Sequence, residues 1–372
     1  MSTGYGQRQI EKGGIPINKR IKKLREKMRT SGVQGVIILS LENRYYFSKF
    51  RGSSGALLIT EQEALLFTDF RYIDQAKEQA PYFEVLQHTQ NLYERIALTL
   101  QKLDIKKVGI ESSTMAVEIY FEMKEHFKEI VMENMDQPIA DLRMFKDQEE
   151  LDAIQRGIQI TEQAFLQTLP LLKVGMTEKE LGLELEFAMR RLGAEGIKAN
   201  HVIASGERSA LPHGQATERV IQVGDLVKMD IGAKVDGYYS DFTRTVVMGE
   251  PSEKQKHIHE IVLKAQLAAL AVIGPGKVCR EMDEVARSII RDAGYGENFG
   301  HSLGHSIGLA IHEKPTMRST DSSILQPNMV VSVEPGIYIP GFGGVRIEDL
   351  VQITEEGIHN FTTAPKELKV IG

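Results

Sequence analysis

The chain has 372 residues, with 45 lysines and arginines against 51 aspartates and glutamates, and a formal net charge of −6. Because the two signs are mixed along the chain without blocks, the composition argues against a surface for nucleic acid or for an anionic membrane. A chain of this length is long for one hydrophobic core, so two domains are expected.

The single cysteine and the N-terminal sequence bear on the cell compartment. Cys279 excludes an intramolecular disulfide and a thiolate metal cluster, and we interpret it as a small buried apolar residue on a helix. The N-terminus lacks the apolar core of a signal peptide, and the apolar runs elsewhere are too short for a membrane span. These features predict a cytoplasmic protein.

The first half of the chain is predicted to form a mixed α/β layer. Residues 1–15 are polar and glycine-rich and are expected to form a mobile N-terminal segment. Amphipathic stretches then alternate with short apolar runs bounded by turn residues. These patterns predict helices over 17–28, 72–79, 93–103 and 115–127, and strands over 35–40, 55–60, 64–69 and 107–110.

No glycine-rich phosphate loop follows any of these predicted strands. Without that fingerprint, nothing in this half indicates a nucleotide site. Residues 16–138 are therefore interpreted as a scaffold or oligomerisation domain. Pro138 is predicted to break the preceding pattern and to mark the boundary, so that a second domain covers residues 139–372.

Two segments of the second domain have similar patterns. A long helix is predicted over 148–169, and after a glycine turn Thr177 and Glu180 have the spacing of a capping box that opens another helix. A helix that starts near Ser252 is likewise followed by a glycine turn and a further helix. This similarity allows a duplicated unit with a site between its halves, and coincidence between two amphipathic helix pairs explains it equally well.

Two carboxylates lie in sequence that is typical of buried strands. Asp230 belongs to an alternating run, and Asp241 directly precedes a run that begins at Phe242. Turn chemistry at Gly232 and at Asp236-Gly237 lies between the two runs. The pattern predicts a hairpin that brings the two carboxylates side by side. Adjacent carboxylates either share a proton or need a cation.

Other residues upstream and downstream of this predicted hairpin offer further metal ligands. Glycine-rich, turn-like sequence surrounds four histidines, His213, His301, His305 and His312. Glu334 ends an apolar run, where an unpaired buried charge costs several kcal/mol. Glu348 follows Arg346 closely, and pairing of these two on a surface strand is an alternative. Four carboxylates with one imidazole form an oxygen-rich pocket that can hold two divalent ions and that suits Mn²⁺, Co²⁺ or Zn²⁺ more than copper.

The order and spacing of these residues resemble the aminopeptidase P and prolidase family of proline-specific metallopeptidases. The resemblance rests on L-P-H-G, G-H-S-I-G-L-x-I-H-E, V-E-P-G-I-Y and G-V-R-I-E-D in the second half, and on E-N-R-Y-Y-F, F-R-G-S-S-G and T-D-F-R-Y in the first. It implies an α+β protein: a pita-bread catalytic domain, which is a curved antiparallel sheet covered by helices, follows a smaller creatinase-like α/β domain. It also implies a homodimer or a dimer of dimers.

The resemblance also implies roles for individual residues. The metal ligands are Asp230, Asp241, His305, Glu334 and Glu348, which hold two divalent ions, Mn²⁺ before Co²⁺ or Zn²⁺. His213, His301 and His312 are substrate-pocket residues, and Arg346 orients a carboxylate ligand or binds substrate. Glu334 is predicted to pass a proton from the attacking water to the leaving imide nitrogen. His213 and His312 are predicted to stabilise the oxyanion.

The predicted activity is that of an Xaa-Pro aminopeptidase, which releases the first residue from peptides with proline in the second position. Two departures from the family matter: Ala310 stands where members often carry an acidic residue, and Thr316 stands where dipeptidases tend to have an arginine. The nearest arginine is Arg318. The second departure favours an aminopeptidase that accepts longer peptides.

Three alternatives remain at this level. An Xaa-Pro dipeptidase (prolidase) has the same architecture. A methionine aminopeptidase uses similar ligands but usually lacks the N-terminal domain. A non-catalytic binding protein, or a metal-free amidinohydrolase such as creatinase, uses the same scaffold but lacks the full ligand set.

Overall fold

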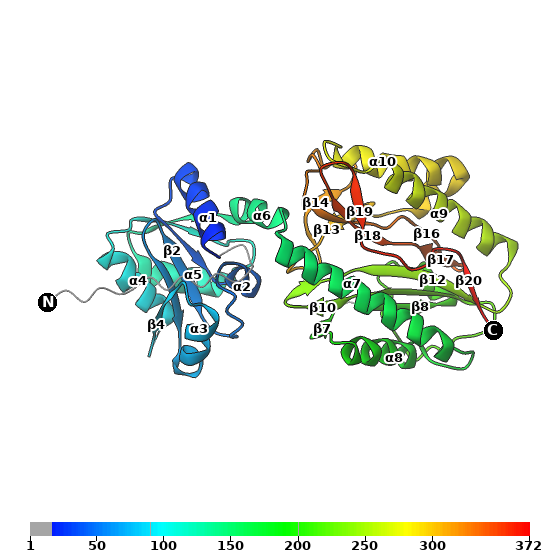
Figure 1. Cartoon of the computed structure of the whole chain (residues 1–372), viewed down its shortest axis with the longest axis horizontal. Helices are drawn as coiled ribbons and strands as arrows, with labels where there is room; N and C mark the ends of the chain where they lie inside the picture. Colours follow the sequence, from blue (N-terminus) through cyan, green and yellow to red (C-terminus); the bar gives the residue numbers. More distant parts are fainter. Residues whose placement is uncertain (1–16, 90, 200) are drawn as a thin grey trace. The chain divides into compact units, whose positions relative to one another are not determined.

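The computed structural model describes residues 17–89, 91–199 and 201–372 and contains two compact units (Figure 1). One unit holds the described residues through Met135 together with Asp147–Glu149, and the other holds Asp136–Lys146 and Glu150–Gly372. The expected mobile segment, residues 1–15, lies outside the described residues. The domain limits at residues 138 and 139 stay a prediction.

The first unit is a mixed α/β layer, as predicted. Its six strands form one sheet in the order β4-β3-β2-β1-β5-β6, in which β1, β2 and β3 are antiparallel neighbours and the other pairs are parallel. Its elements are α1 (Ile17–Ser31), β1 (Gly35–Ile38), α2 (Leu41–Ser48), β2 (Ala56–Thr60), β3 (Ala64–Thr68), α3 (Ile73–Gln79), β4 (Glu84–Gln87), α4 (Leu92–Lys102), β5 (Lys107–Ile110), α5 (Val117–Phe127) and β6 (Val131–Asn134).

The sequence patterns did not reveal α2 and the edge strands β4 and β6. Both edge strands are largely exposed and polar, so they lack the apolar runs that mark the buried strands. Helix α2 has an ordinary start, because the Ser40 hydroxyl accepts a hydrogen bond from the backbone N–H of Asn43. It ends at Ser48, and the capping residue that follows, Lys49, has a φ of 64°.

Pro138 does not break the chain's local structure, so that interpretation is wrong. It lies in the first turn of helix α6 (Asp136–Met144). A proline is tolerated there because the first N–H groups of a helix have no intrahelical partner to lose.

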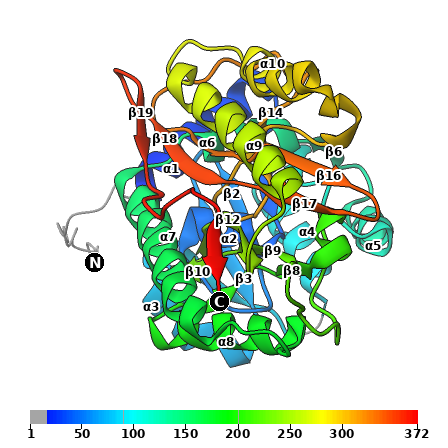
Figure 2. The same ribbon diagram turned by 90° about the vertical axis from the view of Figure 1, so that its right-hand side faces the viewer.

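In the second unit, helices cover sheets that are antiparallel except for the parallel pair β12–β20. Figures 1 and 2 show α9 and α10 side by side on one of these sheets. Two sheets carry the site, in the orders β20-β12-β9-β8 and β14-β13-β15-β18-β19. The remaining elements are α7 (Gln148–Thr168), α8 (Glu178–Arg191), β7 (Gly196–Ile197), β8 (Val202–Ser205), β9 (Leu226–Ile231), β10 (Ala233–Val235), β11 (Tyr238–Tyr239), β12 (Phe242–Met248), α9 (Glu253–Val272), α10 (Cys279–Ile290), β13 (Gly304–Ser306), β14 (Glu313–Met317), β15 (Val330–Val333), β16 (Gly336–Ile339), β17 (Gly343–Arg346), β18 (Asp349–Ile353), β19 (Ile358–Asn360) and β20 (Lys369–Ile371). Within the described ranges, no helix combines the length and the apolar character needed to cross a membrane.

The predicted pairing of the two acidic strands is confirmed, but their connection differs from a simple hairpin. Strands β9 and β12 are antiparallel, with Asp230 opposite Thr243. The intervening residues form a smaller hairpin, β10 to β11, whose two-residue turn has positive φ at both Asp236 (48°) and Gly237 (84°). That geometry belongs to the hairpin turns that favour Asp-Gly.

The two similar segments also share local geometry. Each is helix, glycine turn, helix, and the predicted capping box of Thr177 and Glu180 is confirmed. Gly175 N–H donates to Ile221 O at 3.0 Å, and Gly276 N–H donates to Leu325 O at 2.8 Å. Asp230 and Glu334 each lie nine residues after these two acceptors. The two halves therefore present one site carboxylate each from equivalent positions.

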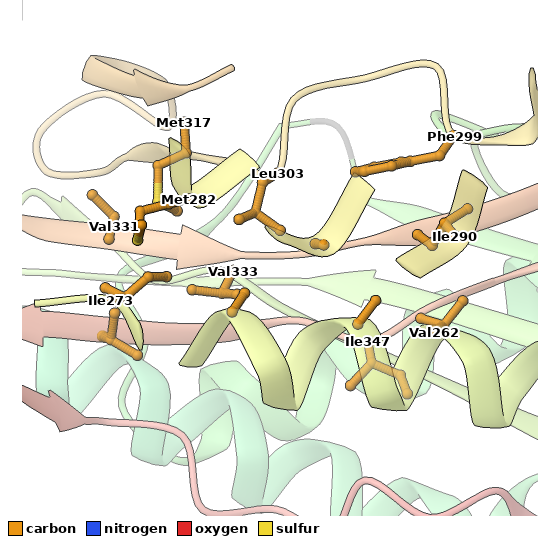
Figure 3. Close-up of a cluster of buried hydrophobic side chains, with 14 of the residues drawn as sticks. Val262, Ile273, Met282, Ile290, Phe299, Leu303, Met317, Val331, Val333 and Ile347 are labelled. Carbon is orange, nitrogen blue, oxygen red and sulfur yellow. The ribbon is translucent and has the colours of Figure 1, made fainter. Parts of the chain in front are cut away.

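A hydrophobic cluster lies next to the predicted ligands Glu334 and Glu348. It packs α9 and α10 against the sheet, and its members include Val262, Ile273, Met282, Ile290, Phe299, Leu303, Met317, Val331, Val333 and Ile347 (Figure 3). Val333 and Ile347 each directly precede a predicted ligand, Glu334 and Glu348. Because successive side chains of an extended chain point to opposite faces, burying the apolar residue directs its acidic neighbour the other way.

Cys279 belongs to this cluster and is fully buried at the start of α10, which confirms its interpretation. Burial raises the pKa of its thiol to about 12. The thiol therefore stays protonated and unreactive at neutral pH.

We predict that Gly304→Ala destabilises the second unit. A Cβ at this position would lie 1.9 Å from the carbonyl oxygen of Ser332, so the two strands must separate. The expected cost is about 1–3 kcal/mol, measured as a lower midpoint of thermal unfolding. Gly357→Ala is the control, since its Cβ meets nothing within 4 Å. Equal midpoints for the two variants would contradict the close approach.

Candidate metal centre

The structure brings the five predicted ligands together within the second unit. Asp230 is the penultimate residue of β9, and Asp241 directly precedes β12. His305 lies in β13, Glu334 directly follows β15, and Glu348 lies in the β17–β18 connection. The two sheets meet at an isolated bridge between Thr243 and Glu348. There the N–H of Glu348 donates to Thr243 O at 3.1 Å, and the Thr243 hydroxyl donates to Glu348 Oε2 at 2.6 Å.

Three of the five have ligand atoms that face one another. One such atom each from Asp241, His305 and Glu348 lies within 4.8 Å of the other two. His305 Nε2 is 3.9 Å from Asp241 Oδ2 and 3.3 Å from Glu334 Oε1. An imidazole nitrogen surrounded by carboxylate oxygens is a typical ligand set for a divalent transition metal.

Hydrogen bonding leaves the correct nitrogen of His305 available. Its Nδ1 lies 3.1 Å from the carbonyl oxygen of Ser306. Because a carbonyl only accepts, Nδ1 carries the proton and Nε2 presents a lone pair to the carboxylates. Burial also lowers the pKa of His305, which favours the neutral ring that metal binding requires.

The carboxylates of the site have properties expected of residues that bind a cation. Glu348 Oε1 is buried, and no group in the described part of the chain donates a hydrogen bond to it. Burial and then the neighbouring carboxylates raise the pKa of Glu348 far above its ordinary value, and burial raises the pKa of Asp241 and Glu334 as well. A divalent ion here would satisfy the orphaned oxygen and remove the repulsion, so the residues fit a metal.

The buried Arg346 contacts several side chains of the site. Its guanidinium contacts Asp230 Oδ2, donates to the Thr243 hydroxyl at 3.2 Å and to the Tyr338 hydroxyl at 2.7 Å, and lies 3.8 Å from Glu334 Oε2. The alternative of a surface pair between Arg346 and Glu348 is wrong, because both side chains are buried and Arg346 contacts Asp230 instead.

The three predicted pocket histidines occupy different settings. His301 Nδ1 donates to Ser302 O at 2.8 Å, so its Nε2 accepts from the Tyr338 hydroxyl, also at 2.8 Å. Burial lowers the pKa of His301 to about 3. His312 is exposed and its ring centre lies 4.4 Å from that of His305. His213 is also exposed, and partial burial followed by the charge of Arg346 lowers its pKa.

The two positions that depart from the family pattern both make hydrogen bonds within the loop after His305. The backbone N–H of Ala310 donates to Glu313 Oε1 at 3.1 Å, and this buried carboxylate also contacts Arg143 and Lys146. Thr316 lies in β14, where both its N–H and its hydroxyl donate to Asp321 at 3.0 Å. These side chains therefore hold the loop after His305 together.

Sequence reasoning missed Lys198. This buried lysine follows β7, and its ammonium donates to Asp230 Oδ1 and, at 2.5 Å, to Asp241 Oδ1. Burial alone would lower the pKa of Lys198, but the two aspartates outweigh that effect and raise the pKa above its ordinary value. No motif surrounds this residue, so the sequence carried no signal for it. Tyr338, also missed, lies inside the V-E-P-G-I-Y motif.

We predict that Arg346→Lys destabilises the protein although it keeps the charge. A lysine cannot reproduce the fork of hydrogen bonds to Asp230, Thr243 and Tyr338, and buried acceptors lose their donors. The expected loss is about 2–3 kcal/mol in the free energy of unfolding. Arg291→Lys, at an exposed pair with Glu284, should leave the free energy of unfolding essentially unchanged. Similar losses for both variants would show that the fork contributes little.

Comparison with known proteins places this geometry in a family. Residues 152–355 match the sequence model of metallopeptidase family M24, and residues 20–145 match that of the creatinase/prolidase N-terminal domain. The chain is 39% identical to an Xaa-Pro dipeptidase of Pyrococcus furiosus over 95% of this chain and 100% of that protein.

Solved structures agree with this match. An Xaa-Pro dipeptidase from Bacillus anthracis is 42% identical with a TM-score of 0.93, covering 95% of this chain and 99% of that one. An X-Pro aminopeptidase from Thermotoga maritima is 40% identical with a TM-score of 0.86, covering 93% and 100%. The predicted α+β architecture and the family resemblance are thus confirmed. The chain belongs to metallopeptidase family M24, with a pita-bread catalytic domain that follows a creatinase/prolidase N-terminal domain.

Proposed function

We propose that the protein is a metal-dependent Xaa-Pro dipeptidase, which hydrolyses the bond before a C-terminal proline. One observation carries this proposal: Asp241, His305 and Glu348 direct ligand atoms at one another in a chain of family M24. The choice of dipeptidase rests on relatives of that name that are 39% and 42% identical over nearly the whole chain. They favour the sequence-based alternative over the aminopeptidase predicted first.

We propose that divalent metal, with Mn²⁺ preferred over Co²⁺ or Zn²⁺, is held by residues from the predicted set of Asp230, Asp241, His305, Glu334 and Glu348. A divalent ion in this position supplies Lewis-acid chemistry, which lowers the proton affinity of water and polarises a peptide carbonyl. The sequence predicts two ions. The number that binds is set by the sum of the charged side chains in the site.

Glu334 is the proposed acid–base residue. Its Oε1 accepts a hydrogen bond from the Ser332 hydroxyl at 2.9 Å, which orients the carboxylate toward His305. In this role Glu334 takes a proton from the attacking water and delivers it to the proline nitrogen. That nitrogen has no hydrogen of its own in the peptide, so it needs this proton to leave.

The histidines and Arg346 are proposed to act on the substrate. The exposed rings of His213 and His312 can donate to the carbonyl oxygen as it gains negative charge, each contributing about 10²–10³ in kcat. His301 and Arg346 both make a hydrogen bond with the Tyr338 hydroxyl, so these three side chains hold one another in position. The cytoplasmic location and the homodimer or dimer of dimers belong to the same proposal.

The test is a comparison of two substrates. The purified protein, stripped of metal and restored with Mn²⁺, should hydrolyse Ala-Pro and leave Ala-Pro-Ala essentially intact. A Xaa-Pro aminopeptidase is the second candidate, because Thr316 replaces the arginine expected of a dipeptidase and the Thermotoga maritima relative is an X-Pro aminopeptidase. Cleavage of Ala-Pro-Ala at least as fast as Ala-Pro would select that candidate, and no cleavage of either would reject both.

Glu334→Gln should abolish proton transfer while leaving the fold intact. We expect kcat for Ala-Pro to fall by about 10²–10⁴. The control is Glu356→Gln, at an exposed turn, which should leave kcat unchanged. Full turnover by Glu334→Gln with metal bound would exclude this residue as the acid–base group.

His305→Ala and His213→Ala should separate metal binding from substrate binding. His305→Ala removes a proposed ligand, so metal content after dialysis should fall with activity. His213→Ala should keep its metal and lose about 10²–10³ in kcat. Elemental analysis alongside kinetics measures both quantities. The reverse pattern would exchange the two roles.

A further inference from the structure

Lys198 occupies the space between two of the proposed ligands. Its ammonium contacts Oδ1 of both Asp230 and Asp241, and only 5% of the residue is exposed. The backbone holds it there, because the Lys198 N–H donates to Gly232 O at 2.8 Å. A Cβ on Gly232 would lie 3.4 Å from Lys198 Cδ, so the lysine stem packs directly against this glycine.

These contacts use the oxygens that one half of a two-metal site would need. Asp230 Oδ1 contacts Lys198 and Asp230 Oδ2 contacts Arg346, so both oxygens of Asp230 already face a cation of the chain. Asp241 Oδ1 also faces Lys198, whereas Asp241 Oδ2 faces His305. The remaining buried oxygen without a donor in the described ranges is Glu348 Oε1. The ligand atoms that no lysine or arginine contacts therefore lie on the side of His305 and Glu348.

The balance of charge points the same way. The site holds the carboxylates of Asp230, Asp241, Glu334 and Glu348, and it holds the cations of Lys198 and Arg346. If all of them are ionised, two negative charges remain, which one divalent ion neutralises. A second divalent ion would leave an excess of two positive charges in a buried region, and an uncompensated buried charge is costly.

We propose that Lys198 takes the place of one metal ion, so that each chain binds a single divalent ion between Asp241, His305 and Glu348. The proposal rests on the proposed function in that the site binds metal, and it is independent of which proline peptide is cleaved. Lys198 acts as a tethered cation that holds Asp230 and Asp241 together. One ion per subunit is thus proposed in place of the two that the sequence predicted.

The experiment counts metal ions. The full-length protein is stripped of metal, dialysed against Mn²⁺ at increasing concentration and analysed for bound manganese, with electron paramagnetic resonance of the same samples. We expect one Mn²⁺ per chain at saturation and the spectrum of an isolated ion. Lys198→Ala frees oxygens of both aspartates and should bind two, with the spectrum of a spin-coupled pair.

Lys146→Met is the matched control. Lys146 is similarly buried, with 3% exposed, but its ammonium donates to Ser306 and Glu313 rather than to the aspartates. This variant should still bind one Mn²⁺. If Lys198→Ala does not fold, the count for the unaltered protein decides alone.

Each outcome has a clear meaning. Two spin-coupled ions in the unaltered protein would overturn the proposal, and cleavage of Ala-Pro by that sample would leave the proposed function standing. A folded Lys198→Ala that still binds one ion would also overturn it. If the unaltered protein binds no manganese and cleaves no proline peptide, the proposed function fails and this proposal fails with it.

Discussion

Four carboxylates lie close together in the second unit, and three of them, Asp230, Asp241 and Glu348, are almost fully buried. Their mutual repulsion and their loss of hydration are the main electrostatic costs of this site. The surrounding features offset those costs: Arg346 and Lys198 contact Asp230, and the Thr243 hydroxyl donates to Glu348. One oxygen of Glu348 still has no donor among the described residues, which is where a metal ion is most strongly favoured.

The scaffold holds these charges in place through its two similar halves. One half contributes a carboxylate from the end of β9 and the other from the end of β15, and the bridge between Thr243 and Glu348 joins their sheets. Behind the second half, the cluster in Figure 3 buries Val333 and Ile347 next to the acidic residues that follow them. Burying each such side chain contributes about 1.5–3 kcal/mol. Apolar packing thus maintains a polar arrangement that would otherwise separate.

Much of this could be predicted from sequence because it depends on local patterns. Alternation around Asp230 and the apolar run after Asp241 predicted two paired strands, and they pair as expected. The inserted hairpin at Asp236-Gly237 was missed, because the same turn residues also fit a direct connection. Lys198 could not be found, since an isolated lysine in sequence is usually a solvated side chain. Its role depends on a contact with residues 32 and 43 positions away.

The central claim is that these scattered side chains converge to bind a divalent metal. Crystals grown with Mn²⁺ and measured at the manganese absorption edge test it most directly. The account predicts an anomalous difference peak in contact with Asp241, His305 and Glu348. A crystal without a peak there, or with these three side chains facing separate surfaces, would contradict it.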